Sequence, residues 1–347
     1  MVVTEIKNRD KTMDVARGIA IMVMIMGHTG CGIPFFDFSL WYHAWHMPIF
    51  YIVSGYFFSG RNSDIQSFIA KKARQLLVPF AFWLAFDYVY YFFQSYDWEY
   101  IKNNLLNACF VWPTGCKGFP VAGALWFLPA LFSLEAIYIV MTRLFTNKKI
   151  FYIMAVVVGF CGMAAAKCGM YLPFGIDAAL VGVPFMAVGE LLWTNRSHRF
   201  VKELMNMRWY VFLPVFIIVN LLFFYNGSVN FRGTYSNNFL LTYFNAIMGS
   251  VLLFNISRFA VGNLGNVPGI RLTLNVCSLT GMNSIIYVCL NQRIISLVQP
   301  KFDAILERVP LGGGIVAILT MVTVIFVGYI VMLVFCGSNK MKKFVGK

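Results

Sequence analysis

Residues 312–336 read GGGIVAILTMVTVIFVGYIVMLVFC, a mostly apolar run without one Asp, Glu, Lys or Arg. As a helix rising about 1.5 Å per residue, it would extend about 37 Å and exceed the roughly 30 Å hydrocarbon core of a bilayer. The overall composition also indicates a membrane protein. Of the 347 residues, 59% are hydrophobic and 12% are charged, whereas soluble domains carry about 25% charged residues. We therefore expect an integral membrane protein.

Nine other stretches are long and apolar enough for membrane helices. The predicted spans are 15–34, 44–60, 77–94, 124–145, 150–166, 177–193, 209–225, 239–257, 278–298 and 312–336. The predicted fold class is thus an all-α integral membrane protein, a polytopic bundle of about ten transmembrane helices. No loop is large enough for a soluble domain, so we expect one membrane-embedded domain over 1–347, with an arm at 1–14, the spans at 15–336 and a basic tail at 337–347.

The basic residues predict the orientation of this bundle. A formal net charge of +14 could suggest nucleic acid as a partner, but the charges lie between apolar runs. Sorted by alternate loops, 21 Lys and Arg fall on the side of both termini and 7 on the other. Because cytoplasmic loops carry the excess of Lys and Arg, we expect both termini in the cytoplasm and the protein in the inner membrane, surrounded by lipid and without a nucleic-acid partner.

The first predicted span contains two ionisable residues. In DVARGIAIMVMIMGH (14–28), Arg17 and His28 are eleven positions apart, close to three helical turns, so both leave the same helix face about 16 Å apart along the axis. Ionisable residues inside spans usually mark functional sites. Two alternatives remain open: Arg17 could reach the lipid headgroups, and His28 could cap the outer end of the helix.

Two segments are predicted at the outer ends of spans. In HMPIFYIVSGYFF (46–58), His46 belongs either to a substrate pocket or to the interface, and we interpret Ser54-Gly55 as a helix-packing pair, since small residues let helices approach closely. In ALWFLPALF (124–132), Trp126 lies where a belt of aromatic residues is expected in any case.

On the predicted cytoplasmic side, KKARQLLVPF (71–80) begins the third span with Lys71, Lys72 and Arg74. These cations could bind an anionic substrate at a helix start, or could serve only membrane topology and anionic lipid. Four acids and a polar pair fall inside or at the ends of other spans: Asp87, Glu135, Asp177, Glu190 and Asn283-Ser284.

The eight cysteines are scattered, and none forms a C-x-x-C pair or a cluster with histidine at zinc spacing. We expect no metal site. Cys109 and Cys116 share an outer loop and could form a disulfide, or could be unpaired.

Together these segments resemble the acyltransferase 3 family of membrane O-acyltransferases, especially short members without a fused hydrolase domain, such as fucose 4-O-acetylase-like polysaccharide O-acetyltransferases. The resemblance is carried by Arg17 and His28 with ten residues between them and by the order and spacing of 46–58, 71–80 and 124–132. Weaker similarity lies in PFMAVGELLW (184–193) and MNSIIYVCLNQ (282–292).

The chain departs from the family pattern twice. Lys71 and Arg74 stand where the family often has two arginines, and lysine lacks the bidentate phosphate recognition of arginine. Leu290-Asn291 stand where many relatives have a second histidine. Any role of that histidine is therefore in doubt here.

The resemblance implies transfer of an acyl group, usually acetyl, from acetyl-CoA or another acyl-CoA to a hydroxyl of a cell-surface polysaccharide or lipid-linked glycan. It also implies that His28 is the key catalytic residue, and an imidazole with a pKa near 6.5 suits a general base. We expect Arg17 to hold a phosphate or the thioester oxyanion. The remaining expected site residues are Lys71, Lys72 and Arg74 for the coenzyme A phosphates and His46, Trp126 and Asn283 for the acceptor.

A transporter or flippase for a lipid-linked sugar is the main alternative. It would use the same ten spans and could couple buried Arg, His and Asp to protons. It predicts paired repeats and broken helices, and the sequence shows no convincing pair of either.

Overall fold

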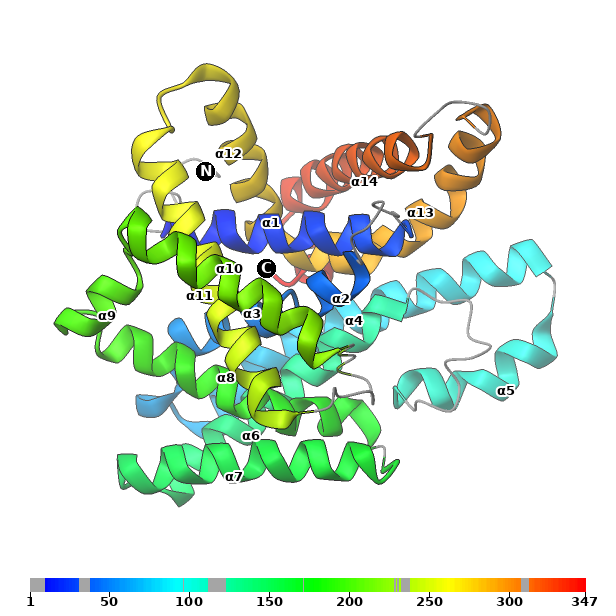
Figure 1. Cartoon of the computed structure of the whole chain (residues 1–347). Helices are drawn as coiled ribbons and strands as arrows, with labels where there is room; N and C mark the ends of the chain where they lie inside the picture. Colours follow the sequence, from blue (N-terminus) through cyan, green and yellow to red (C-terminus); the bar gives the residue numbers. More distant parts are fainter. Residues whose placement is uncertain are drawn as a thin grey trace.

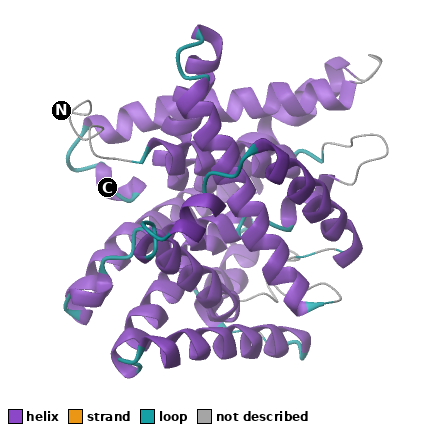
Figure 2. Ribbon diagram, turned by 60° about the vertical axis from the view of Figure 1, so that its left-hand side comes forward, coloured by secondary structure: helices purple, strands orange, loops and turns teal. Residues whose placement is uncertain are grey.

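A computed structural model describes residues 10–30, 38–95, 97–111, 123–170, 172–227, 229, 231, 238–306 and 312–347, and every regular element in these ranges is helical (Figure 2). The α-helices are α1 (Lys11–His28), α2 (Phe38–His43), α3 (Pro48–Tyr56), α4 (Ile65–Ser95), α5 (Trp98–Cys109), α6 (Phe127–Leu144), α7 (Lys148–Lys167), α8 (Ile176–Thr194), α9 (Arg199–Leu204), α10 (Trp209–Asn226), α11 (Phe239–Asn263), α12 (Pro268–Met282), α13 (Ser284–Leu306) and α14 (Gly312–Gly337). Short 3₁₀ helices are η2 (Gly60–Asn62), η4 (Gly123–Trp126), η5 (Pro173–Gly175) and η6 (Lys342–Val345). The predicted all-α class is confirmed for the described residues.

Helix α1 crosses the middle of the bundle and packs against α3, α11, α12, α13 and α14 (Figure 1). Helices α6 and α8 are also central, since 67% and 78% of their apolar windows are buried. By contrast, α10 and α14 are 17% and 22% buried and present apolar side chains outward. Because such surfaces are stable only against lipid or protein, the chain is a multi-pass membrane protein.

Seven of the described helices are long and apolar enough to cross a membrane: α4, α6, α7, α8, α10, α11 and α14. An eighth span is obtained if α12 and α13 count as one, although they meet at 94°. These eight correspond to eight of the ten runs in the sequence. The sequence shows no convincing pair of broken helices, and in the described residues the structure adds a single bend, between α12 and α13.

The other two runs, 15–34 and 44–60, give helices that do not qualify as spans among the described residues. Helix α1 carries Lys11, Asp14 and Arg17 within 18 residues, and charged residues are costly in hydrocarbon. Helix α3 has only nine residues, which is about 13 Å. The number of ten spans is therefore not confirmed.

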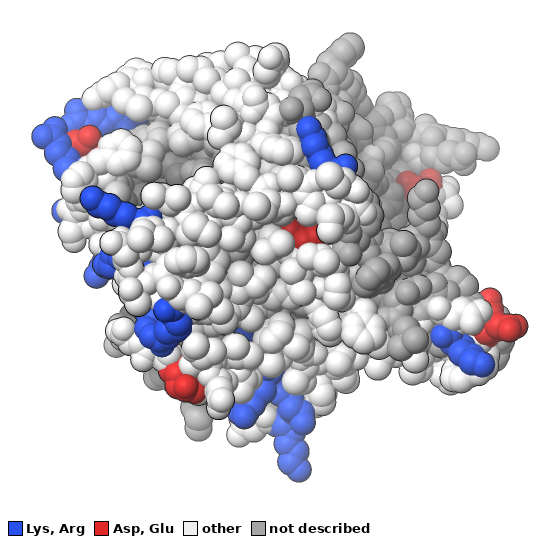
Figure 3. Space-filling model, turned by 90° about the horizontal axis from the view of Figure 1, so that it is seen from below, with Lys and Arg blue, Asp and Glu red and all other residues white. Residues whose placement is uncertain are grey.

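Charge is unevenly distributed over the molecule. Figure 3 shows most of the Lys and Arg of one face toward its left-hand and lower edges, whereas the middle of the face is mostly uncharged apart from one acidic side chain and a basic one above it, and a few charges lie at the right. The left is also the end at which α9 lies in Figure 1, whereas α5 lies at the opposite end. The membrane side on which each end lies remains a prediction.

Pairs of glycines set the closest helix contacts. A side chain on Gly18 of α1 would overlap the carbonyl of Cys277, and one on Gly281 of α12 would overlap the carbonyl of Asp14. Gly55 of α3 likewise contacts the Met186 carbonyl of α8. The packing interpretation of Gly55 is confirmed, and the α1–α12 contact seats the first turns of α1 against the bend that follows Gly281.

Ion pairs connect helices that are distant in sequence. Arg293 Nε of α13 donates to Asp87 Oδ1 of α4 at 3.0 Å, and the two side chains are 10% and 3% exposed. Arg61 binds Glu190 of α8, whose Oε2 also accepts from the Tyr138 hydroxyl at 2.6 Å. The hydrogen bond that Arg61 donates to Glu190 raises the pKa of the Arg61 guanidinium above its ordinary value, so Arg61 stays charged.

We expect Asp87→Asn to lower stability by about 3–5 kcal/mol, because breaking one side of a buried ion pair leaves the other charge uncompensated. The double variant Asp87→Leu/Arg293→Met should recover most of this loss. Thermal unfolding in detergent measures the stability of the single and the double variant. The control is Glu203→Gln, which breaks the exposed Arg199–Glu203 pair and should change little. A shift for Asp87→Asn no larger than that of the control would contradict the expectation.

Candidate active site

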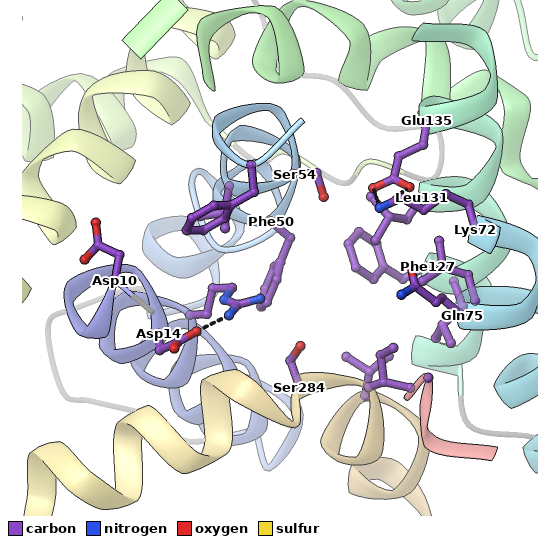
Figure 4. Close-up of a pocket in the computed structure, with 18 residues that line it drawn as sticks. Asp10, Asp14, Phe50, Ser54, Lys72, Gln75, Phe127, Leu131, Glu135 and Ser284 are labelled. Atoms are coloured by element: carbon purple, nitrogen blue, oxygen red, sulfur yellow. Dashed lines mark hydrogen bonds and ion pairs between the residues drawn. The ribbon is translucent and has the colours of Figure 1, made fainter. Parts of the chain in front are cut away.

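A cavity of about 560 Å³ opens between α1, α3, α4, α6 and α13. Figure 4 shows its two charged walls: Asp14 with its dashed contact on α1 at the left, and Lys72 with Glu135 at the right. The hydroxyls of Ser54 and Ser284 face the space between these walls. Cationic, acidic and hydroxyl groups thus face one another inside an otherwise apolar bundle.

The left wall is built by the first turns of α1. Asp14 and Arg17 are one turn apart and form an ion pair, in which Arg17 Nη2 donates to Asp14 Oδ1. Asp14 is 3% exposed, and its backbone carbonyl lies against Gly281. The carboxylate therefore holds the guanidinium in one orientation at the edge of the cavity.

The right wall joins α4 to α6. Lys72 Nζ donates to Glu135 Oε1 at 2.9 Å and is 2.8 Å from Oε2. Glu135 is 3% exposed, so this ion pair is shielded on one side. The sequence marked Glu135 as a buried acid but gave no signal for its partner, because the two residues are 63 positions apart.

Between the charged walls the lining carries two hydroxyls, and most of the rest is aliphatic or aromatic. Ser54 and Ser284 carry the hydroxyls, while Phe50 and Phe127 pack together with ring centroids 5.7 Å apart. Ser54 thus lines the cavity although its neighbour Gly55 serves packing. A narrow apolar slot with a few fixed polar groups is typical of a small-molecule site.

A second cavity, of about 460 Å³, lies next to the first along α4 and is strongly basic. Lys71 and Arg74 line it and are one helical turn apart, whereas Lys72 faces the central cavity. Gln75 lines both. The basic cluster of the sequence is therefore divided between two adjacent cavities, and only Lys72 shares one with Arg17.

Three histidines gather where α1 ends and α2 turns into α3. The rings of His43 and His46 are 5.5 Å apart, and His28 lies within electrostatic range of both. Tyr42 lies among them, and its ring fits against Gly27, where any side chain would overlap it. The structure thus brings His28 and His46 together, and it adds two residues, His43 and Tyr42, to their surroundings.

Hydrogen bonds define the protonation of these rings. His46 Nδ1 lies 2.8 Å from the carbonyl oxygen of Tyr42, and since a carbonyl only accepts, Nδ1 carries the proton and Nε2 is the acceptor. Gln292 Nε2 of α13 lies 3.5 Å from His28 Nε2. An amide N–H can donate there only to an unprotonated ring nitrogen. Gln292 was missed by the sequence analysis, although it lies in the segment where the family often carries a second histidine.

The described residues do not place Arg17 and His28 in one cavity. His28 is exposed at the end of α1 and does not line the central cavity. Along the shared face of α1, Ile21 and Met24 lie between them and are buried in the core. An apolar layer about one to two turns thick therefore separates the histidine cluster from the cavity.

The chain was compared with known families and proteins. The family model described as acyltransferase domain, of the acyltransferase 3 type, matches residues 10–337, which include both ion pairs of the cavity, the histidine cluster and the whole cavity lining except Gly346. The chain belongs to the acyltransferase 3 family. No solved structure matches.

Two curated proteins are similar to parts of this acyltransferase 3 chain. Nodulation protein NolL of Mesorhizobium japonicum is 30% identical over 136 residues, which cover 36% of this chain and 34% of that protein. Nodulation protein NolL of Sinorhizobium fredii is 36% identical over 89 residues, covering 22% of this chain and 24% of that protein. The chain therefore aligns with only about a third or a quarter of the length of these relatives.

Two expected substrate residues of this acyltransferase lie outside the central cavity. Trp126 is half-buried at the start of α6, with its ring 6.2 Å from that of Phe127. Asn283 ends α12, where its Nδ2 donates to the Leu279 carbonyl at 2.8 Å, and its neighbour Ser284 faces the cavity instead.

No three His, Cys, Asp or Glu side chains of the described residues are placed to hold a metal ion. The possible disulfide between Cys109 and Cys116 is not tested, because Cys116 lies outside the described residues.

Proposed function

We propose that this acyltransferase moves an acetyl group from acetyl-CoA to a hydroxyl of a cell-surface polysaccharide or lipid-linked glycan. The observation that carries the proposal is the central cavity, in which Arg17 and Lys72 lie on opposite walls of a slot lined by three phenylalanines and several aliphatic side chains. The adjoining basic cavity supports the proposal. A donor with several phosphates and a long neutral arm needs a basic surface for the phosphates and a mainly apolar slot for the arm. The two nodulation proteins add similarity to parts of the chain only.

The donor would enter from the basic cavity. Lys71 and Arg74 would bind its phosphates, and the pantetheine arm would extend past Gln75 into the central cavity. Arg17, oriented by Asp14, would bind a phosphate or the carbonyl oxygen of the thioester. Charge-assisted hydrogen bonds of this kind are about twice as strong as neutral ones.

The acceptor would approach the histidine cluster from the other end of α1. His28 Nε2 takes the proton of the acceptor hydroxyl, the oxygen attacks the thioester carbonyl, the carbon–sulfur bond breaks, and coenzyme A leaves as the thiolate. His46 and Trp126 would contact the acceptor. Asn283 would act at the inner end of the site, where its neighbour Ser284 faces the central cavity. For the thioester to meet His28, the layer of Ile21 and Met24 must open, and an unbranched Met side chain moves easily.

This division of labour proposes a topology as well. The basic cavity faces the cytoplasm, where acyl-CoA is made, and the histidines face the opposite side of the inner membrane. Both termini would be cytoplasmic. Helices α1 and α2–α3 would complete the ten spans as buried helices screened from lipid by their neighbours.

Acyl transfer by the purified protein tests the proposal. The protein in lipid nanodiscs receives acetyl-CoA labelled in the acetyl group, together with a lipid-linked glycan fraction from its host. We expect label in the glycan fraction, released by mild alkali as an ester should be, with one free thiol formed per acetyl transferred. The absence of both label and thiol would contradict the proposal.

A flippase for a lipid-linked sugar is the second candidate, because α12 and α13 form one broken pair with a bend of 94°. Broken helices are common at transporter sites. In proteoliposomes this candidate predicts movement of the glycan lipid between leaflets without acetyl-CoA. The acyltransferase proposal predicts no such movement.

A further inference from the structure

After α14 the chain turns back and packs against α4 and α14. This tail, residues 338–347, lies beyond the part of the chain that matches the family. Its backbone is fixed by Trp83, whose Nε1 donates to the Phe344 carbonyl at 3.1 Å. The ring of Phe344 stacks on Phe82 with centroids 4.4 Å apart. Two aromatic residues of α4 therefore hold the middle of the tail.

The end of the tail fits tightly between α4 and α13. Val345 is 3% exposed. Gly346 has a left-handed φ of 78°, and a side chain there would overlap the carbonyl oxygen of Gln75 and the side chain of Ile285. Only glycine meets both requirements. The tail is thus packed in a defined position and contributes to the walls of both cavities.

This placement brings two more lysines into the basic cavity. Lys343 and Lys347 line it together with Lys71 and Arg74. Lys347 Nζ donates to Asn283 Oδ1 at 2.6 Å, which is a neutral partner. In the part of the chain that the structure describes, none of the four cations forms an ion pair with a carboxylate. Four like charges around one small cavity repel one another unless an anion neutralises them.

We propose that Lys343 and Lys347 of the tail bind the phosphates of the acyl donor, and that the tail directs the donor arm into the central cavity. The directing role of the tail follows from its position between the two cavities. Gly346 lines the central cavity, whereas Lys343 and Lys347 line the basic one. The inference rests on the proposed function, since it assigns the donor phosphates to named residues outside the matched family region.

Coenzyme A binding to the full chain tests the inference. The variant Lys343→Gln/Lys347→Gln removes two exposed charges and should fold normally. We expect its Kd for coenzyme A, measured calorimetrically in nanodiscs of neutral lipid, to rise about fivefold to tenfold at low salt. The difference should shrink at high salt because the phosphate contacts are screened. The matched control is Lys340→Gln/Lys342→Gln, which removes the same charge from the same tail at residues that line neither cavity.

Two further measurements distinguish phosphate of coenzyme A from phosphate of a lipid headgroup. They also separate the tail site from the proposed acyl transfer. Coenzyme A and pantetheine are compared, because only the first carries the phosphates, and the tail variant should lose affinity for coenzyme A alone. Retention of anionic phosphatidylglycerol through purification is measured in parallel. An unchanged Kd for coenzyme A, or a loss of phosphatidylglycerol alone, would overturn the inference. Wild-type protein that binds coenzyme A through these lysines but transfers no acetyl group would overturn the proposed function and leave the tail site standing.

Discussion

His28→Ala is expected to lower acyl transfer to surface glycans by about 10²- to 10⁴-fold, the usual contribution of a general base. The hydroxyl of a sugar is a poor nucleophile until its proton is removed, and a neutral imidazole such as that of His28 can take this proton. The ring is exposed at the end of α1, so the variant should fold and accumulate normally. The measurement is the O-acetyl content of surface glycans from cells with equal amounts of either protein.

Two histidines serve as controls for this result. His198 caps α9, where its Nδ1 accepts from the Phe200 backbone, and His198→Ala should leave transfer unchanged. His43→Ala changes the surroundings of His28 without removing the base and should have a smaller effect. Equal O-acetyl content with wild type and His28→Ala would refute the catalytic assignment.

Arg17→Gln should reduce kcat/KM for acetyl-CoA by about 10- to 10²-fold. The substitution removes the cation that faces the central cavity and, at the same time, the charged partner of Asp14. Removing a charge-assisted contact costs about 1.5–3 kcal/mol. Arg17→Lys should also be impaired, because lysine keeps the charge but loses the two-pronged geometry. Steady-state kinetics at varied acetyl-CoA measures both.

Stability must be separated from donor binding in these variants. Asp14 is buried, so Arg17→Gln should also lower thermal stability, since a buried charge without its partner costs about 3–5 kcal/mol. The double variant Asp14→Asn/Arg17→Gln should regain stability and remain inactive. If the double variant recovers both stability and activity, the ion pair is purely structural.

The sequence predicts the class of this protein well, because the relevant signals are local. The absence of charge from 312–336 and the Arg17–His28 spacing lie within single segments, and the family is confirmed. The Asp14–Arg17 pair is equally local, since residues three apart on a helix are neighbours. Helix α3 is shorter than the apolar run 44–60 because the chain bends between α2 and α3. Hydropathy alone does not predict such a bend.

The composition of the site depends on contacts between distant segments. Lys72 and Lys71 are adjacent in sequence, yet they face different cavities because neighbouring helical positions point about 100° apart. Glu135 and Gln292 reach the site from α6 and α13. The tail appears in the sequence only as a basic stretch, and its return to the bundle depends on Phe82 and Trp83 of α4.

A cryo-electron microscopy map of the protein with a non-hydrolysable acetyl-CoA analogue tests the central claim most directly. We predict density for the phosphates among Lys71, Arg74 and the tail lysines, and a continuous arm past Gln75 that ends beyond Arg17 toward His28. Density for the analogue at another surface, or glycan lipid filling the central cavity instead, would contradict the account.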